Sequence, residues 1–121
     1  MSERQIITHI EDRNKLLEII NKNNNILVIK FGAEWCGPCK KIEGLVNEWF
    51  NFLPQNVTCA KLDADECFDV YAFYKKKRII STIPAFLRYD YGEDSWAPSE
   101  FLFSSDENKI NEFFHKIVND A

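Results

Sequence analysis

The sequence has no excess of positive charge and no long apolar run, and these absences exclude several classes of protein. It holds 15 Lys and Arg against 19 Asp and Glu in 121 residues, a net charge of -4 at pH 7. Proteins that bind nucleic acid by neutralising phosphates need the opposite balance. No apolar run approaches the roughly 20 residues that cross a bilayer, and the N-terminus lacks the apolar segment of a secretion signal. We therefore expect no nucleic acid or membrane as partner, and a reducing, cytoplasmic location, with an organelle or a virion as alternatives.

Histidines and paired cysteines are also scarce, which bears on metal binding. The two histidines, His9 and His115, lie near opposite ends of the chain, and neither has a ligand spacing around it. Of the four cysteines, only Cys36 and Cys39 form a C-x-x-C pair. A structural zinc site needs four ligands, usually from two paired motifs. The sequence favours redox chemistry over a zinc half-site, and we expect no metal and no cofactor.

The segment Trp35-Cys36-Gly37-Pro38-Cys39-Lys40 lies where an apolar run gives way to a helical pattern. At the start of a helix, two cysteines three positions apart lie on one side of the first turn, close enough to bond. Unpaired backbone N–H groups there favour a thiolate at Cys36. Pro38 suits the first turn because its missing N–H needs no partner, and Gly37 is expected to permit a tight turn. The pattern predicts one reactive thiolate and one sheltered thiol, with an inert structural disulfide as the alternative.

Strand and helix patterns alternate along the whole chain. The continuously apolar run 26–31 predicts a central strand covered on both faces, and Ser104 and Glu107 have the spacing of a capping box before a final amphipathic helix. The order βαβαβαββα, without repeats or linkers, predicts an α/β fold with a mixed central sheet and helices on both faces, in one domain over residues 1–121. The expected strands are 5–10, 26–31, 57–63, 84–89 and 100–103, and the helices begin near residues 11, 36, 68 and 107, the second one continuing to Leu53.

Residues 33–40 (AEWCGPCK), residues 60–65 (AKLDAD) and the pair Ile83-Pro84 together resemble the thioredoxin family. The resemblance spans most of the chain and weakens after about Tyr89. It implies the thioredoxin fold and a thiol–disulfide oxidoreductase that reduces protein disulfides. Cys36, which by position is nearer the helix end and solvent, is the expected nucleophile, and Cys39 is the expected resolving cysteine.

The resemblance also implies roles for residues around the two cysteines. Trp35 would provide a flat apolar surface beside the nucleophile. The Ile83-Pro84 bond would be cis and face the cysteines, so that the backbone before it pairs with an extended client, whereas the sequence alone favours an ordinary proline at a strand start. The implied partners are disulfide-containing client proteins and a thioredoxin reductase, and we expect a monomer.

Lys30 departs from the family pattern. It lies six residues before Cys36, where thioredoxins usually have a buried aspartate that helps to move the proton of the second cysteine. An ammonium group cannot accept that proton, so we hypothesise a slower and more oxidising site; the alternative is that the Lys30 stem merely carries its head to water. Lys61 matches a family lysine near the same place, so two cations are expected to crowd there.

A second departure follows the last strand. Residues 101–105 (FLFSS) lack the glycine with which thioredoxins line the client groove, and the segment 90–99 is longer than usual. Bulk at this position favours a narrower range of clients. The alternative to a general reductase is therefore a thioredoxin-like adaptor or a specialised redox partner. A dedicated oxidase or isomerase is a third possibility, and Gly37-Pro38, the family's reducing spacer, argues against an oxidase.

The sequence makes simpler predictions for the remaining two cysteines. Cys59 lies in a predicted core strand and is expected to behave as a small buried hydrophobe. Cys67 begins a predicted helix near the active-site face, and exposure would make it a candidate for intermolecular bridging.

Overall fold

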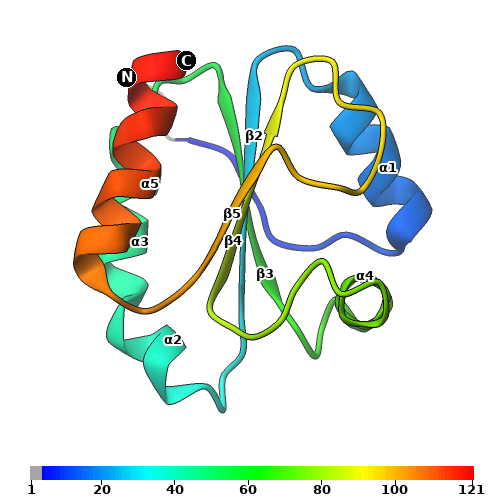
Figure 1. Ribbon diagram of the computed structural model, residues 1–121, viewed down its shortest axis with the longest axis horizontal. Coiled ribbons are helices and arrows are strands. Elements are labelled where there is room, and N and C mark those ends of the chain that lie inside the picture. Colours follow the sequence, from blue (N-terminus) through cyan, green and yellow to red (C-terminus); the bar gives the residue numbers. More distant parts are fainter. Residues whose placement is uncertain (1–3) are drawn as a thin grey trace.

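The computed structural model describes residues 4–121. It contains a five-stranded mixed sheet with the strand order β1-β3-β2-β4-β5 (Figure 1). Strands β1, β3 and β2 pair in parallel, and β4 pairs antiparallel with both β2 and β5. All seven residues of β2 are buried, which confirms the predicted central strand. The strands are β1 (Ile6–Ile7), β2 (Ile26–Gly32), β3 (Val57–Asp63), β4 (Ala85–Asp90) and β5 (Glu100–Phe103).

Helices cover both faces of the sheet, as predicted (Figure 1). Helices α1 (Arg13–Lys22) and α4 (Phe68–Lys76) pack on one face and bury Leu16, Ile20 and Phe73 against it. On the other face lie α3 (Glu43–Phe52) and α5 (Glu107–Asp120), whose apolar stripes form the second core, and the short α2 (Gly37–Lys41) precedes α3. The chain therefore has three layers, with an apolar core on either side of the sheet.

Most predicted elements agree with the structure to within two residues, but two differ more. The helix expected from Cys36 to Leu53 is divided into α2 and α3 at Ile42, where φ is -107° and ψ is 7°. No proline or glycine at that position signals the break, but the Ile42 side chain is fully buried in the core, so packing overrides the continuous apolar pattern. The first strand is only Ile6–Ile7, because within residues 4–121 only these two residues of the predicted strand pair with β3. Ile6 pairs with Cys59, and Ile7 pairs with Ala60.

The predicted capping box is wrong. The N-cap of α5 is Asp106, whose Oδ2 accepts a hydrogen bond from the backbone N of Lys109 at 3.1 Å. Ser104 lies two residues earlier, and its Oγ accepts from the backbone N of Asp106 at 3.0 Å. Aspartate is as good an N-cap as serine, and Asp106 lies directly before the first helical turn.

The sheet topology brings three distant segments to one edge. β2 and β3 are parallel, so their carboxyl ends, Gly32 and Asp63, lie side by side. β4 runs the other way and begins at the same edge, where Ala85 pairs with Phe31. The turn after β2, the loop after β3 and the Ile83-Pro84 segment before β4 therefore meet there.

Candidate active site

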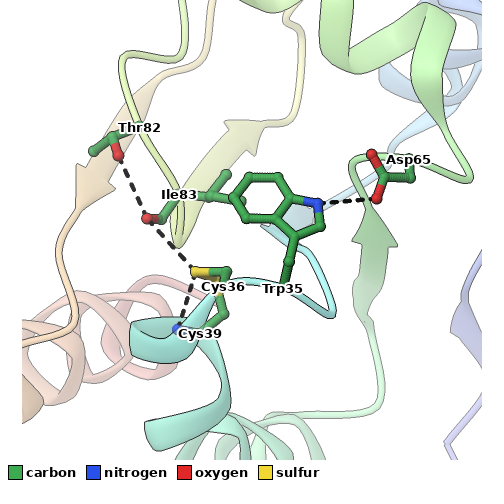
Figure 2. Close-up of a disulfide and its surroundings, with 6 residues drawn as sticks. All are labelled: Trp35, Cys36, Cys39, Asp65, Thr82 and Ile83. Atoms are coloured by element: carbon green, nitrogen blue, oxygen red, sulfur yellow. Dashed lines mark hydrogen bonds between the residues drawn. A yellow bond between two sulfur atoms is a disulfide. The ribbon is translucent and has the colours of Figure 1, made fainter.

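Cys36 and Cys39 are joined by a disulfide at this edge (Figure 2). Their Cα atoms are 5.3 Å apart, inside the range that disulfide geometry allows. Cys36 is the N-cap of α2, its Sγ accepts a hydrogen bond from the backbone N of Cys39 at 3.2 Å, and Pro38 lies in the first turn. The short helix therefore holds both sulfurs on one side and supplies a backbone N–H to Cys36.

The two cysteines are buried beside an exposed tryptophan. Cys36 is only 5% exposed and Cys39 3%, and both pack with Ala33 and Ala64. The neighbouring Trp35 is 66% exposed, and its Nε1 donates to Asp65 Oδ2 at 3.0 Å (Figure 2). This hydrogen bond holds the indole ring next to the disulfide, where the ring presents an exposed apolar surface.

The Ile83-Pro84 peptide bond is cis, as the resemblance implied. The carbonyl oxygen of Ile83 lies 4.0 Å from Cys36 Sγ, and Thr82 Oγ1 donates to the same oxygen at 3.5 Å (Figure 2). The backbone before the proline therefore faces the disulfide, although it is 47 residues away in sequence.

The expected conformational role of Gly37 is wrong for this disulfide form. Its φ lies outside the left-handed region, and a Cβ built at Gly37 would meet no atom within 4 Å. The turn therefore does not require glycine. A side chain at this position would extend into open space.

Lys30 lies behind the disulfide. It is 6% exposed and lines, together with Cys39, a cavity of about 280 Å³. A Cβ on Gly32 would lie 2.8 Å from Lys30 Nζ and 3.5 Å from the Cβ of Cys39, so the ammonium group sits next to the resolving side of the disulfide. The head of Lys30 thus ends in this cavity beside Cys39. Glu43, Lys61 and Asp63 line the cavity too.

The charges around Lys30 partly compensate one another. Burial lowers the pKa of Lys30 most strongly, Glu43 raises it, Lys61 lowers it, and Asp63 raises it. Lys61 is the register partner of Lys30 on β3. Its Nζ donates to Asn47 Oδ1 at 3.1 Å and lies 3.8 Å from Glu43 Oε1, so its head is drawn toward α3. The expected crowding is therefore eased by the acidic and amide groups of that helix.

Both remaining cysteines are free thiols and buried. Cys59 is fully buried on β3 as predicted, and burial raises its pKa to about 11 although Arg4 lies 3.6 Å from its Sγ and lowers it. Cys67 is 1% exposed, packed in the core on the α1 and α4 face. The exposure that intermolecular bridging through Cys67 would need is absent.

Three residues of the site were not foreseen from the sequence. Asp65, the partner of Trp35, ends the 60–65 segment and could have been noticed there. Gly32 lies two residues after Lys30 on one strand, so both share a face, and Glu43 lies four residues after Cys39. Spacing alone hints at these neighbours, but only the fold shows that Gly32 and Glu43 border the cavity that holds Lys30.

Metal ligands and membrane-spanning helices were also sought between residues 4 and 121. No group of three or more His, Cys, Asp or Glu side chains is placed there to hold a metal ion. In the same range no helix has both the length and the apolar character needed to cross a bilayer.

The fold and the site together define a class of protein. A C-x-x-C disulfide that opens a helix at the edge of a mixed sheet, opposite a cis-proline, belongs to a thiol–disulfide oxidoreductase. The family model described as Thioredoxin matches residues 7–116. The chain belongs to the thioredoxin family.

Relatives and a solved structure agree with this assignment. The chain is 35% identical over 91 residues to thioredoxin H7 of Arabidopsis thaliana, which is 73% of this chain and 67% of that protein. It is 34% identical over 97 residues to a thioredoxin of Mycoplasma pneumoniae, covering 80% of this chain and 89% of the relative. The structure of Trichomonas vaginalis thioredoxin superimposes with a TM-score of 0.73 at 22% identity, covering 91% of this chain and 96% of that one, which supports the fold.

Proposed function

We propose that this chain is a cytoplasmic, monomeric protein-disulfide reductase, formed by one thioredoxin domain over residues 1–121. The observation that carries the proposal is the Cys36–Cys39 disulfide with the carbonyl of Ile83, before the cis-proline, 4.0 Å from Cys36 Sγ. Thioredoxin reductase is the proposed electron donor, and disulfide-containing proteins are the substrates.

The reaction begins from the reduced dithiol. The thiolate of Cys36 attacks one sulfur of the client disulfide, forms a mixed disulfide and releases the other client sulfur as a thiolate. The thiolate of Cys39 then attacks Cys36 Sγ, which closes the disulfide seen here and releases the second client thiolate. Two electrons pass to the client, whose two thiolates take up protons, and the donor returns two electrons to Cys36 and Cys39.

The residues around Cys36 are suited to position a client. The backbone of Ile83 faces Cys36 and is available to pair with an extended segment. Trp35, held by Asp65, supplies an apolar wall, and Gly37 leaves space for the approaching chain. Cys36 is the nucleophile in this arrangement because the carbonyl of Ile83 faces it, whereas Cys39 lines the cavity with Lys30.

In this proposal Lys30 affects the second step, in which Cys39 attacks Cys36, and the reduction potential of the disulfide. As an ammonium it cannot take the Cys39 proton, but its charge favours a thiolate nearby, which stabilises the reduced form. Replacing Lys30 by Asp should make the potential more reducing by on the order of 30 mV, equivalent to about 1.4 kcal/mol, and should speed insulin reduction. Unchanged values for both the potential and the rate would eliminate this role.

Insulin reduction with two electron donors tests the proposed function. One assay supplies NADPH and a generic thioredoxin reductase, and the other supplies dithiothreitol. Turnover with both donors is the expected result. Turnover with dithiothreitol alone would reveal a specialised redox partner, and turnover with neither would contradict a reductase and favour an adaptor.

A further inference from the structure

The edge strand β5 carries two stacked phenylalanines. Phe101 and Phe103 alternate along the strand, so both side chains lie on one face of the sheet. Their ring centroids are 5.0 Å apart and their planes differ by 23°. Phe103 packs partly against the core on the α1 and α4 face, whereas Phe101 is 61% exposed. We call this pair the aromatic shelf.

The aromatic shelf begins next to the Ile83-Pro84 segment, which faces the disulfide. Phe103 pairs with Ala85 of β4, the residue directly after the cis-proline Pro84. Ile83, whose carbonyl faces Cys36, packs against the same core as Phe103. Phe101, opposite Leu87, extends the apolar surface two residues farther along the edge.

The charged side chain of β5 does not belong to the shelf. Glu100 alternates with Phe101 and therefore points to the opposite face. There its carboxylate lies 2.9 Å from Lys116 Nζ and 3.7 Å from Arg88 Nη1. The shelf thus offers a ligand aromatic surface rather than charge.

We propose that the aromatic shelf is a docking surface for an apolar side chain of the client, carried on an extended segment next to the client's cysteine. This inference rests on the proposed function. Within residues 4–121, β5 pairs only with β4, so its outer edge is open to an extended chain. With a rise of about 3.3 Å per residue, a side chain two to four residues from the reacting cysteine reaches the shelf.

A pair of peptides tests the inference. Each carries one cysteine linked as a mixed disulfide to thionitrobenzoate, and they differ only in a Phe or a Ser three residues from that cysteine. Single-turnover release of thionitrobenzoate by the reduced protein gives a second-order rate constant for each. The wild type should react about tenfold faster with the Phe peptide, and Phe101→Ala should reduce this ratio to near one.

Phe52→Ala is the matched control, because Phe52 is 68% exposed and ends α3, away from β5. It should keep the wild-type ratio. Equal rates for the two peptides in the wild type, or an unchanged ratio in Phe101→Ala, would overturn the docking surface. A wild-type dimer in sedimentation that Phe101→Ala dissociates would also overturn it, by assigning the shelf to a second copy of this chain.

The small disulfide 5,5′-dithiobis(2-nitrobenzoate) distinguishes failure of the docking surface from failure of the proposed reductase activity. A wild type that reduces it but does not distinguish the peptides contradicts the shelf alone. A wild type that reduces neither this compound nor the peptides contradicts the proposed reductase itself.

Discussion

The two pairs of cysteines in this chain are almost equally buried and yet differ in state. Cys36 and Cys39 are 5% and 3% exposed, and Cys59 and Cys67 are 0% and 1% exposed. Only the first pair forms a disulfide. The exposure of the cysteine itself therefore does not distinguish the redox pair from the other two.

The surroundings make the difference. Cys36 follows the exposed Trp35 and receives a backbone N–H from the first turn of α2. Cys59 lies within β3 under α3 and α5, where burial raises its pKa, and Cys67 lies in the core of the other face. Thiol reactivity follows polar contacts and the access that neighbours allow. The comparison teaches that a reactive cysteine is recognised by the residues beside it.

Serine substitutions at the two cysteines should produce the largest effect. Cys36→Ser removes the nucleophile and should reduce insulin turnover to background. Cys39→Ser keeps the nucleophile but not the resolving thiol, so a mixed disulfide with the client should accumulate. Non-reducing electrophoresis separates these outcomes, with Cys67→Ala as the control that keeps full turnover. Trapped client on Cys36→Ser instead would reverse the assignment of the two roles.

The raised pKa of Cys59 should make the folded state sensitive to alkali. Between pH 9.0 and about 11 the unfolded thiol loses its proton while the folded one keeps it. The unfolded state then binds fewer protons, so the free energy of unfolding falls as the pH rises, by about 3 kcal/mol over this window. Cys59→Val should lack this loss. Urea unfolding of both proteins at pH 8 and pH 11 measures it, and parallel pH profiles would refute the explanation.

Removing the charge of Lys30 should give a smaller, opposite pH dependence. Burial lowers the pKa of Lys30 below its ordinary 10.5, so the charged form costs stability at pH 7. Lys30→Met should therefore stabilise the protein by on the order of 1 kcal/mol at pH 7. The gain should disappear as the pH rises past 10.5, where the unfolded lysine loses its charge too. A less stable Lys30→Met at pH 7 would show instead that Glu43 and Asp63 outweigh burial.

The hydrogen bond of Trp35 should have the smallest effect. Trp35→Phe removes the Nε1 donor to Asp65 but keeps an aromatic ring at the rim. Because the bond is exposed, its loss should cost less than about 1 kcal/mol, with about a twofold slower reaction with protein clients. Asp65→Asn, which keeps an acceptor oxygen, is the matched control. A loss greater than about tenfold in Trp35→Phe would show that the hydrogen bond itself is essential.

The sequence predicted the features that depend on local pattern. The buried β2, the alternation of strands and helices and the position of Cys36 before a helix follow from periodicity and residue type. The cis bond at Pro84 followed only from the family resemblance, because local sequence favours the trans form.

Other features depend on contacts between distant residues and could not be derived. The break at Ile42 results from core packing, without a glycine or proline at that position. The pKa of Lys30 depends on Glu43, Lys61 and Asp63, which come from α3 and β3. The aromatic shelf depends on the register between β4 and β5, which places Phe103 opposite Ala85, the residue after Pro84, and Phe101 opposite Leu87.

Alkylation of the fully reduced protein at pH 7 tests the central claim most directly. Iodoacetamide modification is followed by mass spectrometry at Cys36 and Cys59, with free cysteine as the reference. Our account predicts that Cys36 reacts at least about tenfold faster than free cysteine, as expected for a thiol held as a thiolate at this pH, and that Cys59 is barely modified. If Cys36 reacted no faster than free cysteine, the account would be contradicted.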